Sequence, residues 1–242
     1  MLDLMNLSVT ARNGRRLIDN ITLRLEKGDI LGLTGESGCG KTTLIKSVIG
    51  LLKTEQVSVS GKILLDDTDV TALDEKRRAS LRGTTFALIP QSPMTAFDAS
   101  VKIGSQMRET FAQKLRMKRK EALDYAETCL RDVNLTDTTR ILNSFPGQLS
   151  GGMLQRVAIA LVYGLKPDYI MADEPTSALD EANRKVIADL LCAGCQNRGV
   201  LFVSHDAQSL KRVTKRIPLY EGFRGVQTGA AFLPAPRYAP RA

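Results

Sequence analysis

The chain has 242 residues, of which 43% are hydrophobic and 25% charged, and this composition is typical of a globular protein with a sizeable core. No apolar run approaches the ~18 residues of a membrane-spanning helix, and the start shows no signal-peptide pattern, so we expect a soluble or peripheral cytoplasmic protein. The formal net charge of +8 suggests an anionic partner, such as a nucleotide, a nucleic acid or lipid head groups.

The N-terminal part of the chain is predicted to be rich in strands. Residues 1–9 mix polar and apolar side chains, and residues 21–25 alternate between the two, as in a half-buried strand. Residues 30–33 form a short apolar run typical of a buried strand. Residues 57–59 and 62–65 flank Ser60-Gly61, a pattern that predicts a hairpin.

A glycine-rich loop follows the apolar run at 30–33 and precedes a predicted helix over 44–52. It reads Gly-Glu-Ser-Gly-Cys-Gly-Lys-Thr-Thr and has the strand–loop–helix context of a phosphate-binding P-loop. The glycines let backbone N–H groups surround phosphate oxygens, and Lys41 adds a positive charge near the β- and γ-phosphates. The Thr42 hydroxyl can ligate Mg²⁺. The alternative is a simple glycine turn. The candidate nucleotide-binding residues here are Gly35, Ser37, Gly38, Cys39, Gly40, Lys41, Thr42 and Thr43.

The middle of the chain changes character after a short charged helix at 74–81 and a strand at 85–89. Residues 92–148 contain few β-branched runs, and residues 120–133 carry apolar side chains at helical spacing, so we predict a helical insertion.

Strands are predicted to resume after the insertion. Residues 169–172 and 200–203 are short apolar runs without alternation, as in parallel strands covered on both faces. Residues 217–220 and 226–228 predict two edge strands. The Pro-rich end, residues 232–242, is expected to be irregular.

Two carboxylates follow the strand predicted over 169–172. Asp173 and Glu174 would lie at its carboxyl end, where α/β sheets place their ligands. Asp173 suits Mg²⁺, directly or through water. Glu174 suits a general base for the water that attacks a γ-phosphate. The alternative is an acidic surface turn.

The pentapeptide Leu149–Met153 precedes a helix with one apolar face. Ser150 can cap this helix, and Gly151 and Gly152 let its backbone approach a ligand closely. A capped, glycine-rich helix start is a second candidate anion site. Taken alone, the segment fits a capped core helix equally well.

The order and spacing of these motifs resemble those of the nucleotide-binding subunits of ABC transporters. The resemblance covers nearly the whole chain and rests on the P-loop, Gln91 after a strand, Leu149–Met153, Tyr169–Glu174, Ser177–Asp180 and Ser204–His205. The forms at Gln91–Ala96 and Phe145–Met153 look like those of the peptide and nickel importer branch.

The resemblance implies an α/β fold in a single nucleotide-binding domain, residues 1–242. A RecA-like P-loop NTPase core with an antiparallel β subdomain would comprise residues 1–91 and 161–242. An inserted helical subdomain, residues 92–160, would carry the segment Leu149–Met153, called the signature.

Further site residues are implied by the same resemblance. Ser150, Gly151 and Gly152 of the signature would bind the γ-phosphate of ATP held by another subunit's P-loop. Gln91 would lie near Mg²⁺ and the attacking water and report on them to the transmembrane partner. Asp180 would lie across the dimer interface. His205, the only histidine of the chain, would contact the γ-phosphate.

The chain departs from the pattern of this family at three places. Met153 ends a signature that most often ends in Gln, and Asp98-Ala99 replaces a frequent Asn-Pro. The family usually stacks adenine on an aromatic residue ahead of the P-loop, but no aromatic residue precedes Phe86. A guanidinium plane can stack on a base, so Arg12, or its neighbours Arg15 and Arg16, would replace the aromatic ring.

The expected function is an ATPase that uses ATP and Mg²⁺ to power a bacterial importer for peptides, nickel or similar small solutes. Its partners would be two transmembrane permease subunits and a second ATP-binding subunit, a paralogue being favoured over an identical chain. A substrate-binding protein would be an indirect partner, and nucleic acid none. The place of action would be the cytoplasmic face of the inner membrane. The alternative is an ABC-type ATPase of a non-transport complex, either a carbon–phosphorus lyase or a nucleic-acid-associated assembly.

Overall fold

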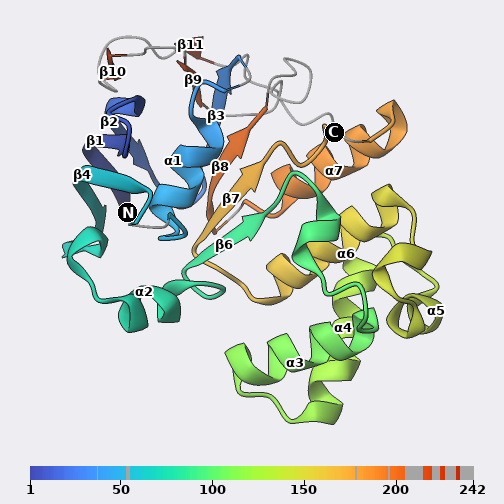
Figure 1. Ribbon diagram of the computed structural model, residues 1–242. Helices are drawn as coiled ribbons and strands as arrows, with labels where there is room; N and C mark the ends of the chain where they lie inside the picture. Colours follow the sequence, from blue (N-terminus) through green and yellow to red (C-terminus); the bar gives the residue numbers. More distant parts are fainter. Residues whose placement is uncertain are drawn as a thin grey trace.

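A computed structural model describes most of the chain. It covers residues 1–36, 38–52, 55–177, 179–195 and 197–204, together with the backbone of three short later strands at 215–219, 224–226 and 233–234. Figure 1 shows two sheets beside a group of helices.

The first sheet is built from the N-terminal strands. Its order is β10-β2-β1-β4-β5, and every pair is antiparallel except β10 with β2. The strands are β1 (Leu2–Ala11), β2 (Arg16–Leu25), β4 (Val57–Leu65), β5 (Thr68–Asp69) and β10 (Arg224–Val226).

The second sheet is parallel except at one edge. Its order is β11-β9-β3-β8-β7-β6, so β8 lies between β3 and β7 although it follows both in sequence. Only β11 is antiparallel to its neighbour. The strands are β3 (Ile30–Gly35), β6 (Phe86–Ile89), β7 (Tyr169–Asp173), β8 (Gly199–Val203), β9 (Lys215–Leu219) and β11 (Leu233–Pro234).

Strand β8 shows that the second sheet is covered on both faces. Val200 and Phe202 pack in the hydrophobic core shared with the helices. Leu201 and Val203 point the other way, into the core shared with the first sheet and α1 (Lys41–Val48). The prediction of a doubly covered strand at 200–203 is therefore confirmed.

The predicted helical insertion forms most of the group at the lower right of Figure 1. None of the helices in the described part of the chain combines the length and apolar character needed to cross a membrane. The longer helices are α2 (Glu75–Leu81), α3 (Ile103–Leu115), α4 (Arg119–Asp132), α5 (Thr138–Asn143), α6 (Gly151–Gly164) and α7 (Glu181–Ala193). Three single turns are η1 (Val70–Ala72), η2 (Pro93–Ala96) and η3 (Pro146–Gln148).

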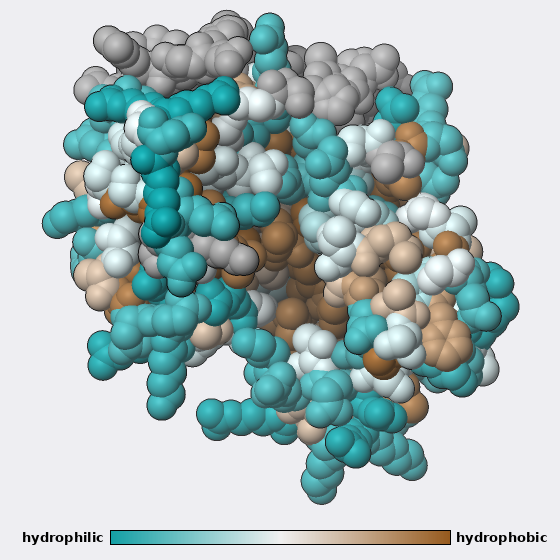
Figure 2. Space-filling view, in the orientation of Figure 1, coloured by the Kyte–Doolittle hydropathy of each residue, from teal (hydrophilic) through white to brown (hydrophobic). Residues whose placement is uncertain are grey.

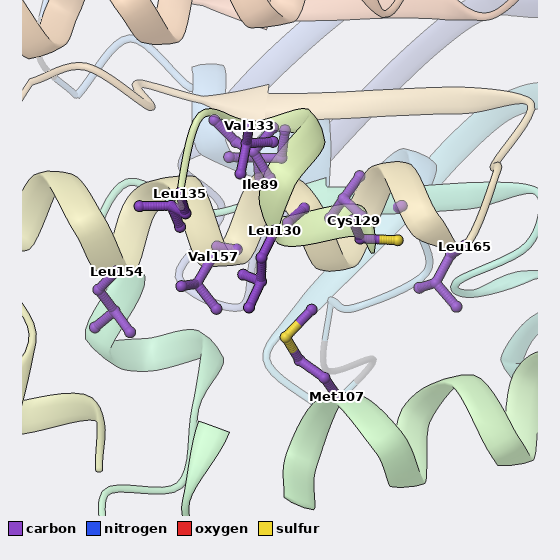
Figure 3. Packing of buried hydrophobic residues seen from close by; sticks show 14 of the residues in the cluster. Ile89, Met107, Cys129, Leu130, Val133, Leu135, Leu154, Val157 and Leu165 are labelled. Atoms are coloured by element: carbon purple, nitrogen blue, oxygen red, sulfur yellow. The ribbon is translucent and has the colours of Figure 1, made fainter. Parts of the chain in front are cut away.

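The insertion is anchored on the second sheet by its own core. Figure 3 shows side chains of α3, α4 and α6, among them Met107, Leu130 and Val157, in one cluster with Ile89 of β6. The burial of these residues joins the helices to one face of the sheet. Helix α6 runs unbroken across residue 160, the predicted end of the helical subdomain.

The hairpin predicted around Ser60-Gly61 is wrong, because β4 continues through these residues as one strand. Gly61 has φ 89°, and a Cβ there would lie 2.4 Å from the Asn6 carbonyl oxygen. The pairing of β4 with β1 also shifts register between Met5 and Ser8. The glycine therefore marks an irregularity within a strand, where two backbones approach closely.

One of the two predicted edge strands is placed differently in the structure. Strand β9 covers most of the predicted segment 217–220 but lies inside the second sheet, between β3 and β11. Strand β10 overlaps the prediction at 226–228 by one residue and does lie at an edge, that of the first sheet. The pairing partner of β9 is β3, far away in the sequence, so local pattern does not reveal this position.

Candidate functional site

The candidate site lies at the carboxyl ends of four neighbouring parallel strands of the second sheet. Strands β3, β8, β7 and β6 lie side by side in this order. The P-loop follows β3, Ser204 follows β8, Asp173-Glu174 ends β7, and Gln91 comes shortly after β6. Segments far apart in sequence thus meet where parallel α/β sheets bind ligands.

Two glycines of the P-loop have left-handed backbone conformations just before α1. Gly38 and Gly40 have φ of 86° and 101°, which favour glycine, and Gly40 precedes the first residue of α1. A Cβ on Gly40 would lie 2.5 Å from the Leu17 carbonyl oxygen and 2.6 Å from Ile18 Cγ2. The loop therefore packs directly on the start of β2. The first N–H groups of α1 have no partners within the helix, so this end is suited to an anion.

A pocket of about 190 Å³ opens at this helix end. The pocket is lined by the P-loop and the start of α1, together with one residue from β2, one that follows β6 and one that follows β7. The lining residues are Leu17, Gly38, Gly40, Lys41, Thr42, Thr43, Gln91 and Glu174. Leu17 was missed by the sequence analysis because the predicted strand began at residue 21. The apolar pair Leu17-Ile18 just upstream is the signal that β2 starts earlier.

Lys41 places a buried cation in the pocket wall. Its side chain is 5% exposed, and Nζ donates hydrogen bonds of 2.7 Å to the carbonyl oxygens of Gly35 and Glu36. The same Nζ lies 3.9 Å from Glu174 Oε1 and 3.8 Å from Cys39 Sγ. A buried ammonium group needs such partners, which hold the charge beside the helix end.

Glu174 reaches the pocket from a strained turn. Its φ of 44° lies in the left-handed region, which residues other than glycine seldom adopt. The Glu174 N–H donates to Val203 O at 3.0 Å, and its carbonyl oxygen accepts from Ser177 N and Oγ at 3.1 Å each. The carboxylate oxygen Oε2 accepts a 3.2 Å hydrogen bond from Gln91 Nε2. The fold thus holds this carboxylate between Gln91 and Lys41.

Asp173 provides a buried carboxylate next to the P-loop. Its Oδ1 accepts a 3.1 Å hydrogen bond from Thr42 Oγ1, and none of the described Lys or Arg residues forms an ion pair with it. Burial raises the pKa of Asp173, although the hydrogen bond from Thr42 opposes the rise. A buried carboxylate beside a hydroxyl is a donor set that suits Mg²⁺.

The signature residues lie outside this pocket. Ser150 caps α6 by accepting a 3.2 Å hydrogen bond from Met153 N, as predicted. Gly151 is exposed, and a Cβ there would meet no atom of the described residues within 4 Å, apart from its chain neighbours and its own helix backbone. Gly152 is buried against Asn183. The structure therefore separates this glycine-rich helix start from the P-loop of the same chain.

Asp180 also lies outside the pocket, at the exposed start of α7. Its Oδ1 accepts a 2.8 Å hydrogen bond from Asn183 N, and its Oδ2 accepts a 2.9 Å hydrogen bond from Asn183 Nδ2. These hydrogen bonds hold the pKa of Asp180 below its usual value.

Of the three remaining candidate residues, Arg12 is the one that the structure describes. Arg12 lies exposed in the turn between β1 and β2, where its N–H donates to Gln56 O at 3.1 Å, and it does not line the pocket described above. Ser37 and His205 lie outside the described residues. The residue before His205, Ser204, is buried, and its N–H donates to Leu33 O at 3.1 Å.

Comparisons with known proteins agree with this geometry. A family model described as "ABC transporter" matches residues 18–177. The metal-staphylopine import system ATP-binding protein CntD of Staphylococcus aureus (strain Mu50) is 36% identical over 221 residues, which are 88% of this chain and 79% of that protein. The oligopeptide transport ATP-binding protein OppD of Lactococcus lactis subsp. cremoris is 37% identical over 211 residues. This match covers 86% of the chain, which spans 62% of that longer protein.

A similar solved structure is the dimeric post-hydrolysis state of the ATP-binding cassette MJ0796 bound to ADP and Pi. Its TM-score is 0.82 at 25% identity, and the likeness covers 98% of this chain and 100% of that one. The predicted P-loop NTPase fold is thereby confirmed. Because the family model matches more than half of the chain, and CntD is similar over most of its length, the chain belongs to the ABC transporter family.

Proposed function

We propose that the chain is an ATP-hydrolysing subunit that powers a membrane importer for peptides, metal chelates or similar small solutes. One observation carries the ATPase assignment: Lys41, Gln91 and Glu174 converge in a single pocket at the start of α1. The importer assignment is supported by relatives that are named as ATP-binding subunits of oligopeptide, dipeptide and metal-staphylopine systems. None of these observations favours the lyase or nucleic-acid alternative.

The residues in and beside the pocket divide into two groups in the proposed reaction, one for the phosphates and one for Mg²⁺. The N–H groups at the start of α1, the glycine loop with Ser37, and Lys41 bind the β- and γ-phosphates. Thr42, Asp173 and Gln91 would hold Mg²⁺, which supplies charge neutralisation at the phosphates when it is bound.

Glu174 is the proposed general base of hydrolysis. Its carboxylate accepts a proton from water as the water oxygen bonds to the γ-phosphorus, and the bond to the β–γ bridging oxygen breaks to leave ADP. Gln91, whose Nε2 donates to Glu174 in the present structure, fixes the orientation of that carboxylate. His205, two residues after β8 in the sequence, would contact the γ-phosphate.

The proposed site is completed by a second ATP-binding subunit. Ser150, Gly151 and Gly152 would bind the γ-phosphate of ATP held by the partner's P-loop, and Asp180 would lie across the same interface. The open space around Gly151 supports this arrangement, as does the dimeric state of the similar cassette MJ0796. Closure would depend on ATP because the nucleotide would bind both subunits only in the closed state.

The helical subdomain, proposed as residues 92–160, is the candidate docking surface for the permeases. Gln91 directly precedes this subdomain in the sequence. Met94 and Phe145 are large apolar side chains within it that remain 46% and 38% exposed. Figure 2 shows a hollow with hydrophobic side chains between the strand-rich part and the helices. Asp98, near the start of this subdomain, is held by hydrogen bonds from Ser100 N and Oγ.

The proposed complex contains two permease subunits and two ATP-binding subunits at the cytoplasmic face of a bacterial membrane. A paralogue is favoured over an identical chain as the second ATP-binding subunit, and a substrate-binding protein delivers the solute to the permeases.

Purification of the intact complex tests this composition. The chain is tagged in its own organism, solubilised with detergent, and its partners are identified by mass spectrometry. We expect permeases and ATPase activity that rises when a peptide or metal chelate is supplied with the binding protein. Recovery of lyase subunits, or of nucleic acid, in place of permeases would contradict the proposal.

A further inference from the structure

Helices α6 and α7 begin in direct contact. Gly152, the second residue of α6, is buried, and a Cβ on it would lie 2.8 Å from both Cγ and Oδ1 of Asn183 and 3.0 Å from Nδ2. Side-chain carbons do not approach other atoms so closely. The carboxamide of Asn183 therefore fills the space that any side chain at position 152 would need.

The same carboxamide is held from its other side by Asp180. Asn183 Nδ2 donates a 2.9 Å hydrogen bond to Asp180 Oδ2, while Asp180 caps α7 by accepting a 2.8 Å hydrogen bond from the Asn183 N–H at Oδ1. Rotation of the carboxamide away from Gly152 would break the first of these hydrogen bonds. The preceding turn is also braced, because Arg184 Nε donates to Leu179 O at 2.8 Å.

We propose that Asn183 is a positioning residue that fixes the separation between Asp180 and the signature helix start. The inference rests on the proposed function, in which both segments of one chain face the nucleotide held by the partner. Asn183 does not touch that nucleotide. It acts as a spacer, because its carboxamide lies where a Cβ on Gly152 would be and is hydrogen-bonded to the Asp180 carboxylate. A displacement of one segment is therefore passed to the other.

A role for Asn183 in stabilising α7 alone leads to different results. Loss of a purely structural residue lowers the stability of the chain and leaves turnover per folded molecule unchanged. Loss of a spacer misplaces the signature against the partner's ATP, so it lowers kcat and leaves ATP binding to the chain's own P-loop intact.

The first test needs no nucleotide and uses thermal unfolding of the full chain. Gly152→Ala adds a methyl group against Asn183 and is expected to lower Tm by roughly 5 °C. Gly151→Ala, one residue away in open space, is the matched control and leaves Tm within about 1 °C. Adding Asn183→Ala to Gly152→Ala restores most of the loss. Equal Tm values for the two alanine variants, or no relief in the double variant, would overturn the proposed contact.

The second test measures turnover in the complex in which the wild-type chain hydrolyses ATP. Asn183→Ala is expected to lower kcat about tenfold with KM for ATP within about twofold. Lys185→Ala, an exposed neighbour on α7, is the control and keeps wild-type turnover. An unchanged kcat in Asn183→Ala rejects the positioning role. A wild-type complex without ATPase activity rejects the proposed function instead, and with it the role of Asn183 at the partner's nucleotide, while the unfolding test still decides the contact.

Discussion

The P-loop and the signature are both glycine-rich helix starts, but the chain surrounds them differently. Around the P-loop, Lys41 is buried and held by two carbonyl oxygens and a nearby carboxylate, and Gly40 packs on the backbone of β2. At the signature, a Cβ on Gly151 would meet none of the described residues within 4 Å, apart from its chain neighbours and its own helix backbone. The first region is organised before any ligand arrives, whereas at the second the part of the chain that the structure describes provides no facing group at Gly151. Changes around the P-loop should therefore alter ATP binding by the chain itself, whereas the effect of changes at Gly151 or Ser150 on hydrolysis should appear only in the assembly.

Replacement of the proposed base gives the largest expected effect. Glu174→Gln keeps the shape of the side chain and its strained turn but cannot accept a proton from water, so turnover should fall roughly 10³-fold. ATP binding should persist, and the assembly should accumulate in its closed, ATP-bound form. Hydrolysis and nucleotide binding measured on the same preparation check this, with Glu181→Gln on the exposed first turn of α7 as a control. Near-normal turnover would falsify the assignment of Glu174.

The two left-handed glycines of the P-loop provide a matched pair for stability. Gly38→Ala has open space around the added methyl group and should cost about 1 kcal/mol of unfolding free energy through its φ alone. Gly40→Ala has the same backbone strain and also a Cβ 2.5 Å from Leu17 O, so its loss should reach about 3 kcal/mol. Denaturant unfolding of both variants measures the difference. Equal losses would show that the P-loop does not rest on β2 as described.

The carboxylates of Asp173 and Asp180 should affect the free energy of unfolding with opposite dependence on pH. The raised pKa of Asp173 means that its contribution to stability is present at low pH and is lost as pH rises through that pKa. Asp173→Asn should therefore stabilise the ligand-free chain at pH 7.5 by about 1 kcal/mol, less so near pH 4, while turnover falls. Asp180 has a lowered pKa, so Asp180→Asn should instead be less stable at pH 7.5. Urea unfolding at both pH values checks the two signs, and a destabilised Asp173→Asn would contradict the account.

The smallest expected effect concerns the base of the nucleotide. If Arg12 stacks on adenine, Arg12→Ala should weaken ATP binding by about two- to fivefold. The affinities of ATP and inorganic triphosphate should be compared, because only the first depends on stacking. Leu17, which lines the pocket directly, is the competing contact. An unchanged ATP affinity in Arg12→Ala removes this residue from the site.

Sequence reasoning succeeds here where the chemistry is local. The P-loop, the Asp173-Glu174 pair and the Ser150 cap each depend on a few consecutive residues, and the structure places them at strand and helix ends as expected. A short apolar run without alternation also identifies the doubly covered strand at 200–203, and helical periodicity identifies the helix at 120–133.

Features that depend on distant partners could not be predicted in the same way. The position of β8 between β3 and β7 determines which strand ends lie together. The sequence of β8 does not indicate which strands it pairs with. Leu17 enters the pocket because the P-loop packs on the start of β2, and Gly61 is needed because Asn6 of the neighbouring strand β1 approaches it. Asn183 is an ordinary helix residue in sequence, and only its contact with Gly152 gives it a role.

The central claim is that the P-loop of this chain is half of a site and that the signature serves another subunit. Ser150→Arg tests it most directly, with ATP binding to the isolated chain and ATP hydrolysis by the complex measured side by side. Ser80→Arg, the same change on the exposed face of α2, is the control. The account predicts wild-type ATP affinity of the isolated Ser150→Arg chain together with loss of hydrolysis in the complex. Weakened ATP binding by the isolated variant, or full hydrolysis by a monomer at high dilution, would contradict it.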